Sequence, residues 1–125
     1  MFPVAVAAVG VATHQCSTAN AYPAMIGTAG LRANAANLAQ YIANNYPGVQ
    51  SIGGVRPDPL PDHPSGRAID IMIGNNMGLG DAIAADVRAQ AGRFNVSYVL
   101  WRVPNHHNHV HVSVRSCATT GPSSD

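Results

Sequence analysis

The chain has 125 residues, enough for one domain with its own core, and 46% of them are hydrophobic. Seven Arg, no Lys, six Asp and no Glu leave a net charge of +1, which argues against a polycationic nucleic-acid-binding protein and an acidic tail. The absence of Glu also excludes a His-Glu-x-x-His zinc protease, because its general base is that Glu.

Residues 1–15 have two interpretations. Val4 to Ala12 has the length and small-residue end of a signal-peptide hydrophobic region, although a basic segment before it is missing. The alternative is a buried first strand. We favour a signal-peptide remnant and therefore export, to the extracellular space or the cell wall. The stretch is too short to span a bilayer, so we expect no membrane span.

The only two cysteines, Cys16 and Cys117, lie near the two ends of the predicted domain, residues 16–117. Their spacing fits no Cys-x-x-Cys metal or redox pattern. A disulfide would close a loop of about 100 residues and stabilise the fold by roughly 4–5 kcal/mol in the chain-entropy model. It would also agree with export. The alternative is two unrelated buried thiols.

The first predicted helix runs from about residue 28 to residue 45, with Thr28 as its N-cap. Its apolar residues recur at helical spacing on one face: Leu31, Ala35, Leu38 and Ile42. A short strand or extended segment follows over residues 51–56, and then a proline-rich loop over 57–64 that holds His63 with little backbone freedom.

The segment from Arg67 to Ile73 predicts the central strand. Alternation places its three Ile residues on a core face and Asp70 on the opposite face. A buried carboxylate is costly unless a positive group lies against it. We therefore expect Asp70 to face a cleft.

The rest of the chain predicts one more helix and two more strands. The helix is marked by Leu79, Ile83, Val87, Ala91 and Phe94 and ends near Gly92. Strands follow over residues 96–103 and 109–114, joined by the loop 104–108, and residues 118–125 form a polar tail. The predicted fold is α+β, a small and mainly antiparallel sheet with two helices packed on one side.

Four histidines fall within six residues, at positions 106, 107, 109 and 111. In a strand, His109 and His111 would share one face while the valines between and after them enter the core. Neutral imidazole is a preferred zinc ligand, and a catalytic zinc needs three protein ligands and an open position. With His63 and Asp70 the chain offers such a set, although the cluster alone could be a surface run.

These residues resemble a known pattern. The segment His63 to Asp70, a His-x6-Asp with an inner Ser-Gly-x-Ala, is similar to the first motif of the zinc superfamily of lysostaphin, the D-Ala-D-Ala peptidases and hedgehog. His109-Val110-His111 is similar to its closing His-x-His. Over residues 28–115 the chain most resembles exported actinobacterial domains of the D-Ala-D-Ala-carboxypeptidase-like type.

The resemblance implies one zinc per chain, held by His63, Asp70 and His111 with a water in the fourth position. It implies cleavage of peptide bonds in peptidoglycan stem or cross-link peptides, often next to D-alanine. His109 would act on that water or stabilise the transition state, and His106 matches a further His of some murein endopeptidases. Arg56 would steady the developing oxyanion, unless it only forms a surface ion pair with Asp58. We expect a monomer whose partners are peptidoglycan peptides, not nucleic acid.

One position departs from the pattern. The D-Ala-D-Ala branch has an acidic base three residues before the last ligand, where this chain has Asn108. Either His109 and His106 replace that base, with Asp62 as a weaker stand-in, or the domain binds zinc without turnover and serves as a cell-wall- or partner-binding module. A further alternative is a disulfide-linked exported domain whose histidines bind nothing.

Overall fold

The computed structural model describes residues 27–116. The predictions for residues 1–15, for the tail 118–125 and for the pairing of Cys16 with Cys117 concern positions outside this range.

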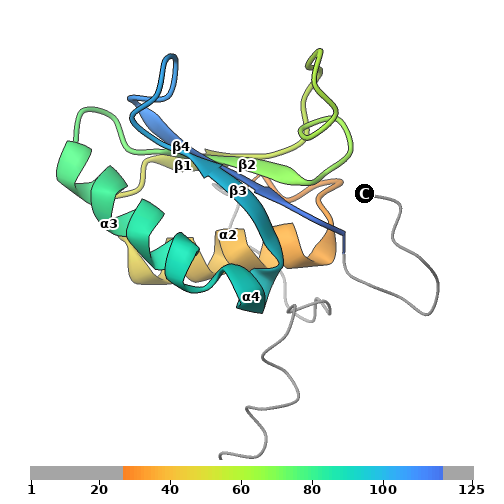
Figure 1. Cartoon of the computed structure of the whole chain (residues 1–125), viewed down its shortest axis with the longest axis horizontal. Helices are drawn as coiled ribbons and strands as arrows, with labels where there is room; N and C mark the ends of the chain where they lie inside the picture. Colours follow the sequence, from red (N-terminus) through yellow and green to blue (C-terminus); the bar gives the residue numbers. More distant parts are fainter. Residues whose placement is uncertain (1–26, 117–125) are drawn as a thin grey trace, which may run out of the picture.

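A four-stranded antiparallel sheet forms one layer of the described chain, in the order β1-β2-β4-β3. Its strands are β1 (Ser51–Gly53), β2 (Ala68–Met72), β3 (Val96–Leu100) and β4 (His109–Val114). Three helices cover one face of the sheet: α2 (Ala33–Asn45), α3 (Met77–Ala89) and the short α4 (Ala91–Phe94) (Figure 1). This confirms the predicted α+β fold with a small antiparallel sheet and helices on one side.

The core lies between the sheet and the helices because the central strands alternate as predicted. Ile69 and Ile71 of β2 are 1% and 0% exposed, and the intervening Asp70 is only partly buried. The valines of β4 and apolar residues of α2 and α3 complete the core: Val110, Val112, Val114, Leu38, Ile42, Ile83 and Val87. Each such side chain contributes roughly 1.5–3 kcal/mol when buried. The opposite face of β2 and β4 is left for polar residues.

The first helix starts later than predicted. α2 begins at Ala33 with Arg32 as N-cap, so the assignment of Thr28 as N-cap is wrong. Gly30 has φ +79°, a left-handed conformation that interrupts a helix, and the Thr28 carbonyl instead accepts a turn hydrogen bond from Leu31 N–H.

The predicted second helix is two helices. α3 ends at Ala89, and Phe94 belongs to the separate turn of α4, which stops at Asn95 with φ 56°. The following strand β3 ends at Leu100 and not at residue 103, since Arg102 also has a left-handed φ of 59°.

Trp101, the first residue after β3, fixes the start of the loop that carries the histidines. Trp101 is 7% exposed and packs on Gly80 of α3, where an added Cβ would collide with the indole ring. Asp81 of the same helix accepts hydrogen bonds from Trp101 Nε1 at 2.8 Å and from Arg102 Nε at 2.8 Å. The loop 101–108 is therefore anchored to α3 at its start.

No helix within residues 27–116 combines the length and hydropathy that crossing a bilayer requires.

Candidate metal centre

The register between β2 and β4 places Asp70 directly opposite His111. Directly opposed residues of antiparallel strands share a face with their Cβ atoms about 5 Å apart. His109, two residues earlier on β4, is on the same face beside Met72. This face is turned away from the helices, as the strand alternation predicted.

His63 reaches the same face from the loop before β2. The loop closes through backbone hydrogen bonds from Gly66 N–H to the His63 carbonyl (3.1 Å) and from Arg67 N–H to the Asp62 carbonyl (2.9 Å). Gly66 has φ +79°, and a Cβ there would collide with the Gly30 carbonyl oxygen. Glycine is therefore required in this motif.

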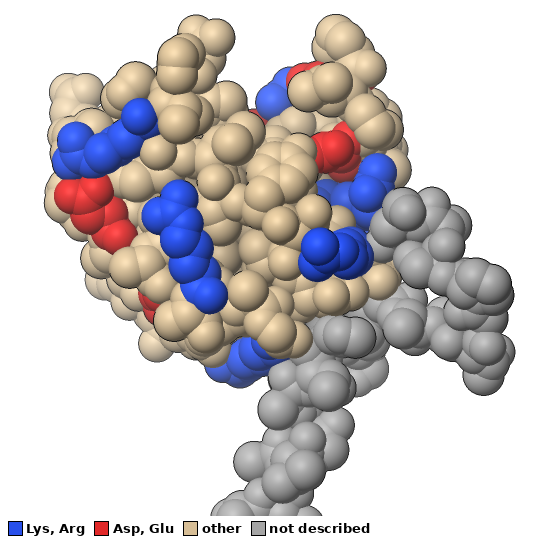
Figure 2. Space-filling view, viewed as in Figure 1, with Lys and Arg blue, Asp and Glu red and all other residues tan. Residues whose placement is uncertain are grey.

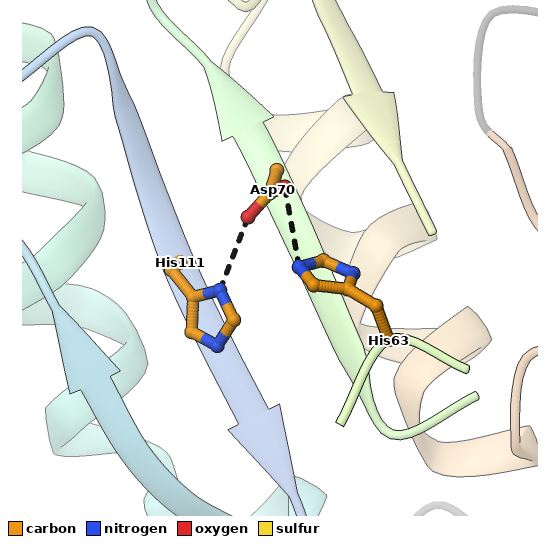
Figure 3. Close-up of side chains that lie close together, drawn as sticks. All are labelled: His63, Asp70 and His111. Atoms are coloured by element: carbon orange, nitrogen blue, oxygen red, sulfur yellow. Dashed lines mark hydrogen bonds and ion pairs between the residues drawn. The ribbon is translucent and has the colours of Figure 1, made fainter. Parts of the chain in front are cut away.

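The three side chains converge from three segments, as Figure 3 shows. His63 Nε2 lies 3.2 Å from Asp70 Oδ2, and His111 Nδ1 lies 3.1 Å from Asp70 Oδ1. His63 and His111 are 3% and 7% exposed, and one ligand atom from each of the three residues lies within 4.8 Å of the others. The structure thus brings together a group that could hold a metal ion.

The hydrogen bonds of His63 determine which nitrogen faces the group. Its Nδ1–H donates to the Gly54 carbonyl at 2.9 Å, because a carbonyl oxygen can only accept. In the neutral ring Nε2 then carries a lone pair, and this buried atom has no hydrogen-bond partner although Asp70 lies beside it. A lone pair facing a carboxylate is repulsive unless a cation lies between them.

The spacing also suits a tetrahedral metal. Two ligands at about 2.0–2.1 Å from zinc lie about 3.3 Å apart at the tetrahedral angle. Each imidazole lies close to this distance from its nearer Asp70 oxygen, 3.2 Å to Oδ2 for His63 and 3.1 Å to Oδ1 for His111, and one ligand atom from each residue lies within 4.8 Å of the others. Two imidazoles and one carboxylate leave a fourth position open, so the residues present fit a catalytic metal.

Positive groups surround the Asp70 carboxylate. Burial alone would raise its pKa. Without a metal, a hydrogen bond from His111, a positive charge on His63 and the hydrogen bond from Arg56 outweigh burial and hold the pKa far below its usual range. Arg56 Nη2 donates to Asp70 at 3.1 Å and Arg56 Nη1 to Asp58 at 2.7 Å. Arg56 therefore forms the ion pair with Asp58 and also contacts Asp70 of the three residues that could hold a metal ion.

His109 lies at the edge of the group, with its Nε2 3.7 Å from Asp70 Oδ1. Its Nδ1 donates to the side-chain oxygen of Asn108 at 2.7 Å, so the neutral ring turns its Nε2 lone pair toward the group. Burial, opposed by Asp70 and assisted by the charges of His106 and His111, lowers the pKa of His109. A neutral imidazole at this place can accept a proton.

His106 is held by a tight turn. A bridge pairs Val103 with His106, and His106 Nδ1–H donates to the Pro104 carbonyl at 2.9 Å. The His106 ring centroid lies 4.9 Å from that of His109 and 5.7 Å from that of His111. His107, the remaining histidine of the cluster, lines a separate hollow beside Asn75 and Met77.

A cleft of about 260 Å³ opens over these residues. One wall is the loop before β2, with Leu60 and Asp62, and the other is the loop between β3 and β4, with Asn105 and His106. In Figure 2 the two loops project from the molecule with a hollow between them. Leu60 and Tyr98 are 65% and 40% exposed, so the cleft has apolar surface beside its imidazoles.

Two neighbours of the centre were missed by sequence reasoning. Ser113 Oγ contacts His111 Nε2 at 2.9 Å, and the Tyr98 ring stacks on His111 with centroids 5.8 Å apart. Ser113 could have been found, since it follows His111 by two residues and period two places it on the same face. Tyr98 carried no such signal.

Comparison with known proteins gives one positive result. A family model described as the VldE C-terminal domain matches residues 27–121, well over half of the chain. No curated protein and no solved structure matches.

Proposed function

The chain belongs to the VldE C-terminal domain family, and we propose that it is a zinc-dependent peptidase acting on peptidoglycan. Its substrates in this proposal are the stem or cross-link peptides that contain D-alanine. The resemblance of His63 to Asp70 and of His109 to His111 to the zinc peptidase motifs supports both the metal and the substrate class. The signal-like N-terminal segment supports export to the cell wall.

One observation carries the proposal. His63 turns a buried, unpartnered Nε2 toward one oxygen of Asp70, and His111 turns Nδ1 toward the other. Without a metal, each nitrogen needs a proton of its own to face the carboxylate. A divalent cation satisfies all three ligands at once, and zinc accepts both imidazole and carboxylate at this spacing.

When bound, zinc lowers the pKa of water to about 7 and polarises a scissile carbonyl. The other tasks fall to the protein. His109 takes a proton from the attacking water on Nε2 and returns it to the leaving amine, while Asn108 holds the ring in the required tautomer. Arg56 donates to the carbonyl oxygen as negative charge develops there. Asn108 thus becomes the orienting partner of a histidine and does not need to be the base itself.

The cleft is compatible with an extended peptide. Its walls offer apolar contact at Leu60, Tyr98 and Leu100, and His106 lies on the side of the loop between β3 and β4. In this proposal His106 contacts the peptide next to the scissile bond and can accept a hydrogen bond at Nε2, since its Nδ1–H is donated to the Pro104 carbonyl.

The test is mass-spectrometric analysis of muropeptides digested by the zinc-loaded protein, with and without a chelator. We expect stem-peptide fragments that disappear with the chelator and return when zinc is restored. The mass of the fragments identifies the bond. No fragments from muropeptides of several chemotypes would reject the peptidase.

The position of Asn108 favours one second candidate, a zinc-bearing module that binds cell wall or a partner without turnover. It predicts that Asn108→Asp creates a peptidase from an inactive parent. The peptidase proposal predicts instead that the parent is already active and that the pH dependence of Asn108→Asp shifts upward, because an Asp would accept the His109 Nδ1–H and raise the pKa of a base that burial now lowers.

A further inference from the structure

The polar face that carries the metal group extends one residue pair further, to Ser113 of β4 opposite Ala68 of β2. Ser113 is 2% exposed. Its hydroxyl lies 2.9 Å from His111 Nε2 and 2.5 Å from Asp62 Oδ2. A continuous hydrogen-bonded chain therefore leads from a carboxylate to the far side of a proposed metal ligand.

Counting protons fixes the direction of this chain. An ionised carboxylate only accepts, so the single hydroxyl proton of Ser113 goes to Asp62. The Ser113 oxygen is then the acceptor for His111, and the proton between them belongs to His111 Nε2. At Nδ1 the partner is Asp70, 3.1 Å away, which also can only accept, so a metal bound at Nδ1 would replace the proton that this nitrogen otherwise donates.

The surroundings of Asp62 agree with an ionised carboxylate. Both Ser113 and Tyr98 direct their hydroxyl groups at its Oδ2 atom, as expected for a carboxylate that only accepts. Tyr98 donates to the same Oδ2 atom and stacks on the His111 ring at an interplanar angle of 15°. The His111 ring is thus held by stacking on Tyr98 and by the hydrogen bond between its Nε2 and Ser113.

We propose that Asp62 and Ser113 are positioning residues that hold His111 as the Nε2–H tautomer, with Nδ1 presented to the metal. The inference rests on the proposed metal site and goes beyond it, because it assigns Asp62 a role other than general base. His63 provides the parallel, since the Gly54 carbonyl fixes its tautomer from the far nitrogen in the same way. Such partners of metal-bound histidines typically change affinity 10–100-fold when removed.

The experiment is zinc titration of the full chain in competition with a chelating dye, on the parent, Ser113→Ala, Asp62→Ala and the double variant. Each single variant should bind zinc about 10–100-fold more weakly. The double variant should be no weaker than the weaker single one, because both changes break one chain. Asp86→Asn, which removes a carboxylate of α3 on the helical side of the sheet, where it accepts from Tyr41 and Tyr46, should stay within about threefold.

A second measurement covers the case in which the buried serine variant fails to fold. In the zinc-loaded parent, nitrogen-15 shifts should show His111 protonated at Nε2 and metal-bound at Nδ1. Protonation at Nδ1, unchanged affinity of both single variants, or additive losses in the double variant would overturn the inference. None of these readings needs peptide hydrolysis, so failure of the peptidase proposal remains a separate result.

Discussion

At the scale of single residues, the structure assigns each histidine of the centre a partner for its second nitrogen. Gly54 accepts from His63, Asn108 from His109 and Ser113 contacts His111. Alternation in the sequence predicted that His109, His111 and Asp70 would share a face. It could not predict the Gly54 carbonyl, because that contact depends on how a proline-rich loop folds back over β1.

His109→Gln tests the proton-transfer role of His109, which lies beside the three proposed metal ligands and is not one of them. Glutamine keeps a polar side chain but cannot take up a proton at neutral pH, so we expect kcat on muropeptides to fall about 10²–10⁴-fold. Zinc content should stay at the parent level. His107→Gln is the matched control, since His107 is exposed and lines the separate hollow. Equal rates for the two variants would contradict the proton-transfer role of His109.

At the scale of elements, the site depends on the register of β2 with β4 and on two anchored loops. The periodicity of residues 67–73 and 109–114 was sufficient to predict both strands and their buried faces. The ends of the elements were not predictable, because left-handed residues at Gly30, Asn95 and Arg102 respond to tertiary contacts. The packing of Trp101 on Gly80 is such a contact.

Gly80→Ala tests this anchor. Alanine normally stabilises a helix by up to about 1 kcal/mol over glycine, but here its methyl group would collide with Trp101. We expect a net loss of about 1–3 kcal/mol in the free energy of unfolding by urea, as for an overpacked core. Gly78→Ala in the same helix is the control, because its nearest neighbour is 3.7 Å away, and it should be neutral or slightly stabilising. Similar values for both variants would show that Trp101 is free to move.

At the scale of the whole molecule, polar groups on the helical side of the described residues join the helices to one another and to the sheet. Asn34 Nδ2 donates to the carbonyls of Phe94 and Arg115, which joins α2 to α4 and to the end of β4. Asp86 of α3 accepts hydrogen bonds from Tyr41 and Tyr46. The sequence predicted the helices that carry these groups, but nothing in its pattern paired the tyrosines with Asp86.

The tyrosine pair makes stability depend on pH in the alkaline range. Burial, together with the Asp86 carboxylate, raises the pKa of Tyr46 to about 12. An unfolded tyrosine titrates near 10, so between about pH 10 and 12 the unfolded chain loses a proton that the native chain keeps. The contribution of Tyr46 to the free energy of unfolding is therefore fully present below pH 10 and is lost as the pH rises toward 12.

Tyr46→Phe should make this alkaline decrease shallower, measured as the free energy of unfolding at a series of pH values. Tyr41 and Tyr98, whose pKa values are also raised, should leave a smaller residual slope. An unchanged slope in the variant would mean that Tyr46 is not held protonated by its surroundings.

The central claim is that His63, Asp70 and His111 hold one zinc ion per chain. Native mass spectrometry of the zinc-titrated parent and of His63→Ala and Asp70→Ala tests it most directly, with circular dichroism to verify that the variants are folded. We predict one zinc per parent chain and none in either variant. A folded parent that binds no zinc, or variants that retain it, would contradict the claim.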